Sequence, residues 1–213
     1  MKSKFAFVIA MLITASFATT AKAEGKLDTP KNTLKTMIKS LTAGKVDAAI
    51  ECFDVEEANK PLVKAQLSIQ SAFMKFDSKM RAAYKDKYDA DKLGQFKGAI
   101  LSEKMVDDAE VSEDGDTATV TIGGKPLELK KVDGKWKIQA AIPELPEAQV
   151  KMQIEVAELF KKAVNDATAL IGKEGQTVET VTKALEENMK KAFQEMMKKA
   201  MEQMQQGNKD EAA

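Results

Sequence analysis

Histidine is absent from this chain, and cysteine and arginine each occur once, as Cys52 and Arg81. Ser-His-Asp and Cys-His catalytic arrangements need a histidine base, so the sequence excludes them. Zinc sites built from histidine and cysteine need more of these ligands than the chain has. A single arginine nearly excludes two-pronged clamps for phosphate or carboxylate groups. We therefore expect no metal site, no cofactor and no enzymatic activity of these classes.

The first 23 residues have the pattern of a secretory signal peptide. Lys2 and Lys4 precede an apolar run at residues 5–18, and Ala21-Lys22-Ala23 is a small-x-small cleavage site. The apolar run is shorter than the roughly 20 residues that cross a bilayer as a helix. We predict cleavage after residue 23 and a soluble periplasmic or secreted protein without a transmembrane segment.

The charges of the mature chain nearly balance. The full chain has 33 basic and 33 acidic residues, and cleavage removes Lys2, Lys4 and Lys22, which leaves 30 against 33. Nucleic-acid-binding domains usually carry a basic surface. We therefore expect no nucleic-acid partner.

The lone cysteine of an exported protein cannot form an internal disulfide. Cys52 lies in the largely apolar run at residues 48–53. We interpret it as a small buried hydrophobic side chain, in preference to an intermolecular disulfide or a redox group.

Residues 106–141 have the pattern of an antiparallel β-meander. Asp114-Gly115, Gly123-Gly124 and Asp133-Gly134 supply residues that tolerate the positive φ of tight hairpins. Between these turns lie β-prone runs at 117–122, 126–132 and 135–141, with apolar and polar residues alternating in the first run. The sequence predicts a one-sided sheet that needs helices on its apolar face.

Helices are predicted before the meander. Thr29 and Pro30 suit the start of a helix that ends at Gly44, and a short helix follows at 45–53. A long helix from about Pro61 toward Tyr88 is expected to be the main cover of the sheet, aided by residues 30–43. Residues 96–111 are expected to form a first strand.

A helical hairpin is predicted after the meander. Pro143 and Pro146 mark a boundary, and heptad-like apolar spacing then runs through 147–171 and 178–206. We predict an α+β domain at 24–142, a hairpin extension at 143–206 and a disordered tail at 207–213. The core is expected to be complete without residues 147–206.

The predicted order of elements resembles the nuclear-transport-factor-two-like (cystatin-related) fold, in particular its small exported bacterial members of unknown function. The resemblance rests on Thr29-Pro30 and on three longer motifs, and it covers residues 29–142. The motifs are Leu41-Thr42-Ala43-Gly44-Lys45, Gly115-Asp116-Thr117-Ala118-Thr119-Val120 and Asp133-Gly134-Lys135-Trp136-Lys137-Ile138. The resemblance implies a cone in which helices fill the concave face of a curved sheet, often with a pocket at the open end. The hairpin lies outside the usual family pattern.

Such a pocket would bind a lipid or another apolar small molecule. Its expected lining is large and apolar or aromatic: Phe73, Phe76, Met80, Tyr84, Met105 and Trp136. The isomerase-like members of the fold imply a second alternative, an enzyme with Tyr84 or Tyr88 as a hydrogen-bond donor and Asp107 or Asp108 as a base. For Trp136, packing in the core against Phe73 and Phe76 is a simpler interpretation than a place in the wall of a pocket.

The last predicted helix is rich in methionine, a flexible side chain suited to adaptable binding surfaces. Met189, Phe193, Met197 and Met201 form a wide apolar face together with the line through Leu185 and Ala192. The simpler interpretation is that this face is buried against residues 147–171 or the sheet. One facing helix is too narrow to cover both lines, so a second copy, a protein partner or a membrane surface would cover the remainder. The predicted function is therefore a non-enzymatic exported interaction module, with the apolar-ligand carrier as the alternative.

Overall fold

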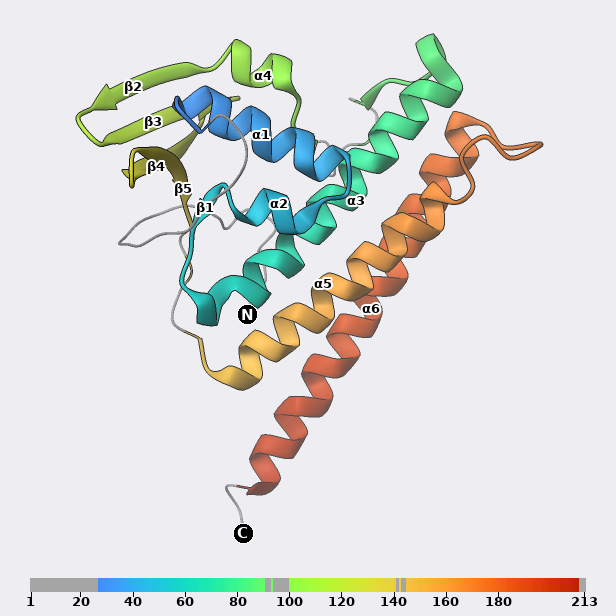
Figure 1. Cartoon of the computed structure of the whole chain (residues 1–213). Helices are drawn as coiled ribbons and strands as arrows, with labels where there is room; N and C mark the ends of the chain where they lie inside the picture. The colour runs from blue at the N-terminus through green and yellow to red at the C-terminus, as the bar shows by residue number, and fades with distance from the viewer. Residues whose placement is uncertain (1–26, 91–92, 94–99, 141, 143–144, 211–213) are drawn as a thin grey trace.

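The computed structural model describes residues 27–90, 93, 100–140, 142 and 145–210 (Figure 1). The predicted signal peptide lies outside these residues. The elements, in chain order, are α1 (Pro30–Thr42), α2 (Val46–Ile50), β1 (Phe53–Asp54), a 3-10 turn (Glu57–Asn59), α3 (Lys60–Tyr84), a second 3-10 turn (Lys85–Lys87), α4 (Glu103–Asp107), β2 (Glu110–Asp114), β3 (Thr117–Ile122), β4 (Lys125–Val132), β5 (Lys135–Gln139), α5 (Glu147–Thr168) and α6 (Val178–Asp210). The predicted α+β class with a C-terminal helical hairpin is confirmed. Across the described ranges, every helix is too short or too polar to span a bilayer.

The sheet has the order β1-β5-β4-β3-β2. Strands β2 to β5 form the predicted antiparallel meander, and Asp133 and Gly134 have the positive φ angles, 49° and 75°, that its last tight hairpin requires. The sheet is nevertheless mixed, because β1 pairs in parallel with β5, with Phe53 opposite Ile138. This two-residue strand was not predicted.

Helix α1 begins and ends at its predicted signals. The Thr29 hydroxyl accepts a hydrogen bond from the Asn32 N–H at 3.2 Å, and Pro30 occupies the first turn. Gly44, with φ 76°, closes the helix and donates its N–H to the Leu41 carbonyl.

The apolar face of the sheet is covered mainly by α1. The Thr33 hydroxyl donates to the Trp136 carbonyl at 3.0 Å, and the Trp136 N–H donates to the Leu27 carbonyl at 2.9 Å, so α1 and the residues before it are fixed against β5. Leu34 and Leu41 are fully buried in the cluster that contains Trp136. The prediction that the long helix is the main cover was wrong, because α3 packs behind α1 and α2.

Part of the predicted first strand is a helix instead. The Ser102 hydroxyl accepts from the Met105 N–H and caps α4. Ion pairs from Lys35 to Asp107 and from Lys39 to Glu103 hold α4 against α1. The strand was therefore predicted too early, and it begins only at Glu110; residues 96–99 of the prediction lie outside the described ranges.

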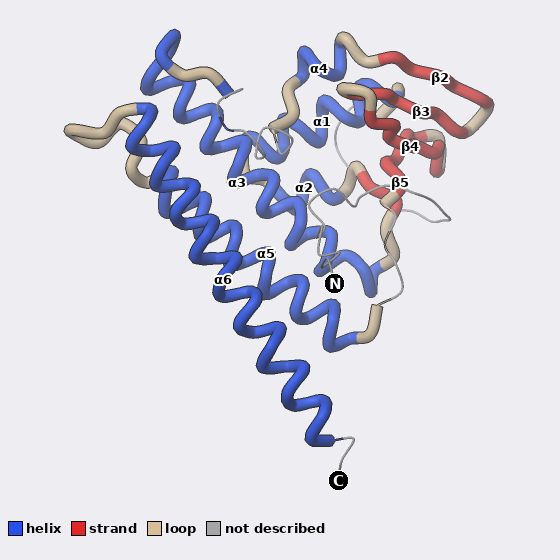
Figure 2. Tube along the Cα trace, turned by 180° about the vertical axis from the view of Figure 1, so that it is seen from behind, coloured by secondary structure: helices blue, strands red, loops and turns tan. Residues whose placement is uncertain are grey.

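Helix α3 divides the interior into two apolar clusters. Val63, Leu67 and Met74 belong to the first cluster, with α1, α2, α4 and the sheet. Other α3 side chains (Ala72, Phe73, Phe76 and Met80) belong to a second cluster with α5 and α6. Figure 2 shows α3, α5 and α6 side by side, away from the strands. The hairpin is thus part of the core, contrary to the prediction that the core is complete without residues 147–206.

Candidate functional site

The six side chains predicted to line one cavity lie in different surroundings. Trp136 is buried in the first cluster. Phe73, Phe76 and Met80 are buried in the second cluster, with Tyr84 at its edge. Met105 is 39% exposed. The structure therefore confirms Trp136 as a core residue, places it in a different cluster from Phe73 and Phe76, and leaves Met105 exposed.

The residues of the isomerase alternative are also not assembled. Asp107 is exposed and pairs with Lys35 of α1. The Tyr84 hydroxyl accepts a long hydrogen bond, 3.4 Å, from the Gly172 N–H in the turn between α5 and α6. Tyr88 has a carboxylate within reach, but it is that of Asp77, whose Oδ1 accepts from the Tyr88 hydroxyl at 2.9 Å.

Asp77, Arg81 and Tyr88 form a polar cluster whose members satisfy one another. Arg81 Nε donates to Asp77 Oδ2 at 2.8 Å, and the guanidinium lies 5.6 Å from the centre of the Tyr88 ring. Burial, followed by the charge of Asp77, raises the pKa of the Tyr88 hydroxyl. We interpret this polar cluster as a structural feature that covers the second apolar cluster near the end of α3. Only the four-residue spacing of Asp77 and Arg81 indicated it in the sequence.

Cys52 is a buried side chain, as predicted, with no exposed surface. Burial raises the pKa of its thiol to about 11, and the neighbouring Lys137 ammonium only partly opposes this rise. We expect the native chain at pH 8 to be unreactive toward a thiol reagent such as DTNB and to release one equivalent of thionitrobenzoate in guanidinium chloride. Fast stoichiometric reaction of the native chain would contradict the buried position.

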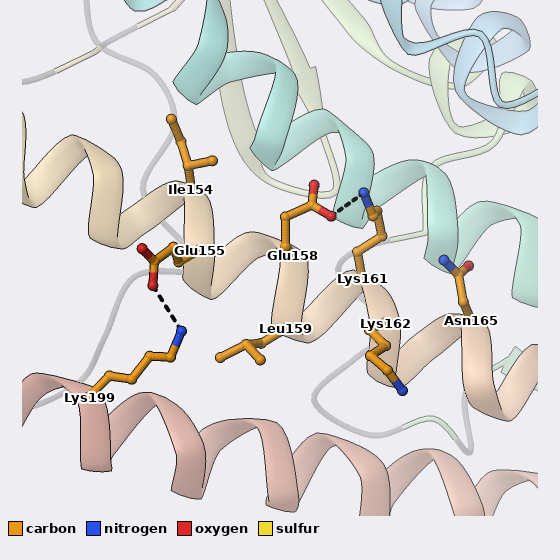
Figure 3. Close-up of a pocket in the computed structure, with 8 residues that line it drawn as sticks. All are labelled: Ile154, Glu155, Glu158, Leu159, Lys161, Lys162, Asn165 and Lys199. Carbon is orange, nitrogen blue, oxygen red and sulfur yellow. Dashed lines mark hydrogen bonds and ion pairs between the residues drawn. The ribbon is translucent and has the colours of Figure 1, made fainter.

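An open hollow of about 570 Å³ lies over the outer face of α5, beside α6. Figure 3 shows Ile154 and Leu159 among its lining, together with the ion pairs Glu155–Lys199 and Glu158–Lys161. Lys199 Nζ lies 2.8 Å from Glu155 Oε2, and this hydrogen bond raises the pKa of the Lys199 ammonium. Because its acids and bases neutralise each other in pairs, the hollow offers no charge of one sign to a ligand. We interpret it as the solvated seam of the hairpin.

The burial of α6 changes along its length. Four of its described side chains are buried, and all four belong to the second cluster: Val181, Leu185, Met189 and Ala192. Beyond residue 192, no described side chain of α6 is buried to this extent. The apolar sequence continues beyond this point, but Phe193, Met197 and Met201 are 48%, 37% and 54% exposed.

We call Phe193, Met197 and Met201 the α6 stripe. They are spaced by four residues and therefore lie along one side of the helix. Met189, the fourth residue predicted for the partner surface, is 4% exposed and faces the core instead. Among the side chains that the structure describes, the only other large apolar one with such exposure is Met105 of α4. The α6 stripe is thus the main concentration of exposed apolar surface in the described part of the chain.

Charges around the α6 stripe are mixed. The exposed lysines Lys190, Lys191 and Lys198 alternate along the helix with acidic residues. Of the exposed acidic residues, Glu186 and Glu187 lie on the side of the stripe, whereas Glu195 and Glu202, like Lys191, lie toward the far side of the helix. The described residues also contain no group of three or more acidic or cysteine side chains placed to hold a metal ion. The stripe is therefore an apolar surface with an approximately neutral rim.

Comparison of the chain with protein-family models, with curated proteins and with solved structures finds no match.

Proposed function

We propose that the chain is an exported interaction module that uses the α6 stripe to bind a helix of another protein chain. The observation that carries this proposal is that beyond Ala192 the apolar pattern of α6 divides: Met196 is still partly buried against the second cluster, whereas Phe193, Met197 and Met201 are exposed. Isolated exposed apolar side chains are common, whereas a row of them along one helix is typical of a binding surface. Export rests on the signal-peptide pattern of residues 1–23.

The rim of the stripe favours a protein over a membrane surface. Helices that lie on anionic membranes carry an excess of lysine and arginine on their polar face. Around the stripe, the exposed Lys190 and Lys198 are offset by the exposed Glu186 and Glu187. Methionine and phenylalanine, in contrast, suit an apolar helical partner, because methionine adapts its shape to the opposing side chains.

We also propose, for the part from α1 to β5, the relationship to the nuclear-transport-factor-two-like fold that the sequence motifs indicate. Helices on one face of a meander that ends in Asp133-Gly134-Lys135-Trp136 support it. Under this proposal the C-terminal hairpin is an addition that carries the binding surface.

Site-specific photo-crosslinking tests the proposed function. A photoreactive benzoyl-phenylalanine replaces Met197 in the full chain, expressed in cells that export it. The matched control carries the same group at Glu195, an exposed residue on the opposite side of α6. We expect irradiation to join residue 197, but not residue 195, to a second polypeptide whose mass and contact peptide are determined by mass spectrometry. Absence of a polypeptide adduct at residue 197, or equal adducts at both positions, would refute the binding role of the stripe.

A further inference from the structure

We propose that the open edge of strand β2 binds an extended, lysine-rich segment of another protein, which adds to the sheet as a further strand. This surface is separate from the α6 stripe, and the inference does not depend on the proposed function of that stripe. It rests on the outer position of β2, on the carboxylates along it and on the residue pattern of its two faces.

Strand β2 ends the sheet on one side. In the order β1-β5-β4-β3-β2 it pairs with β3, and no described strand lies against its other edge. Both views show it at the outer margin of the molecule, away from α5 and α6 (Figure 1, Figure 2). Alternate residues of such an edge direct their N–H and C=O groups outward, where a further strand can pair with them. The five residues Glu110–Asp114 thus offer a template for an extended peptide.

The charge along this edge has one sign. Five exposed carboxylates lie between the end of α4 and the β2–β3 turn: Asp108, Glu110, Glu113, Asp114 and Asp116. In the described part of the chain, none of the five forms an ion pair, whereas the preceding Asp107 pairs with Lys35. They are spread along the strand, and the described residues include no group of three acidic side chains placed to hold a metal ion. This row therefore favours a basic peptide as its ligand.

The same charges disfavour a second copy of this chain. Pairing of two β2 edges would place these carboxylates against their own copies, and like charges on facing strands destabilise the pair. Charged side chains on an edge strand generally prevent such self-association. A lysine-rich strand reverses this effect, because each lysine then lies near a carboxylate. The edge thereby selects a foreign basic segment over a copy of itself.

The two faces of β2 define the residue pattern of the partner. Val111 shares its face with the buried Val120 of β3, so a residue opposite Val111 meets the margin of the first cluster. Glu110 and Asp114 lie on the other face of the strand, where residues two apart are separated by about 7 Å. We therefore expect a segment in which lysine alternates with a β-branched apolar residue such as valine.

NMR titration of the isotope-labelled mature chain tests this binding. The probe is a blocked peptide of four lysines alternating with three valines. We expect a saturable shift of the β2 and β3 amide signals with a dissociation constant of ~0.1–1 mM, because a short edge supplies few hydrogen bonds and exposed ion pairs are weak. A control peptide with prolines in place of the valines keeps the charge but cannot add as a strand, and it should bind at least ~10-fold more weakly.

A charge reversal tests whether the β2 carboxylates select the peptide. Glu110→Lys lies on the edge, and the matched control Glu174→Lys lies in the turn between α5 and α6. Both positions are exposed, and both variants change the net charge equally. Glu110→Lys should weaken binding about three- to tenfold, whereas Glu174→Lys should leave it unchanged within a factor of about two. Circular dichroism should show the wild-type fold for both variants.

Three results would overturn the inference. One is the absence of a saturable shift at β2 with ~2 mM peptide. Another is equal binding of the proline peptide, which would show charge attraction without strand addition. The third is equal weakening by Glu110→Lys and Glu174→Lys, which would show a response to net charge alone. None of these results bears on the α6 stripe, whose role is decided by the crosslink at residue 197.

Discussion

A chain truncated after Pro146 is expected to lose its cooperative fold. The truncation removes α5 and α6 and exposes the second-cluster face of α3, where Phe73, Phe76 and Met80 are almost fully buried. Burial of each such side chain stabilises a protein by ~1.5–3 kcal/mol, so the loss from these three alone approaches the ~5–15 kcal/mol total stability of a typical domain. Calorimetry should show no sharp unfolding transition, and dye binding should report exposed apolar surface.

A second truncation, after Ala192, is the matched control. It keeps Val181, Leu185 and Met189, which are buried in the second cluster, and removes the α6 stripe together with the partly buried Met196. We expect this shorter chain to unfold in one cooperative transition, close to that of the full chain. A cooperative transition in the chain truncated after Pro146 would instead show that α1 to β5 fold alone, as the sequence alone suggested.

The elements that could be predicted from the sequence have strong local signals. Helix α1 carries its own cap and stop in Thr29, Pro30 and Gly44, and the meander has a glycine-containing turn at each reversal. The β1 strand and α4 are too short for periodicity to reveal them. They depend on contacts made by distant residues, such as the pairing of Phe53 with Ile138 and the ion pair of Asp107 with Lys35.

The two-sided burial of α3 explains why the extent of the core was misjudged. The sequence predicts one apolar face, but four consecutive residues from Ser71 to Met74 are buried, and consecutive residues point in different directions around a helix. Ser71 is polar and buried because its hydroxyl donates to the Leu41 carbonyl at 2.7 Å, in the last turn of α1. A polar residue satisfied by another helix gives no hydrophobic signal in the sequence.

The candidate site was predicted in part, and the error has a geometric cause. Met189, Phe193, Met197 and Met201 are each four residues apart, but a helix turns about 400° over four residues. Each step therefore moves ~40° around the axis, and three steps move ~120°. This rotation carries the row from buried Met189 to Met201, which is 54% exposed. The four-residue spacing predicted that all four side chains share one exposed face. In the structure, the row turns gradually from the core to the surface.

Trp136→Ala is expected to lower the free energy of unfolding by ~3–5 kcal/mol, the usual cost of removing a large buried aromatic side chain. Trp136 is 3% exposed and lies between β5 and α1 in the first cluster. Phe76→Ala, in the second cluster, should cost a similar ~3–5 kcal/mol. Chemical denaturation followed by circular dichroism measures both losses, and each variant should still unfold in a single transition because α3 belongs to both clusters.

A double-mutant cycle then decides whether the two aromatic side chains interact. The two alanine variants combined remove too much stability for a reliable measurement, so the cycle uses Trp136→Phe and Phe76→Leu. Since the structure places Trp136 and Phe76 in separate clusters, their effects should add within about 0.5 kcal/mol. The packing inferred from the sequence, with Trp136 against Phe76, predicts instead a coupling of ~0.5–3 kcal/mol. A coupling above ~1 kcal/mol would therefore contradict the division of the core by α3 and favour a single apolar interior.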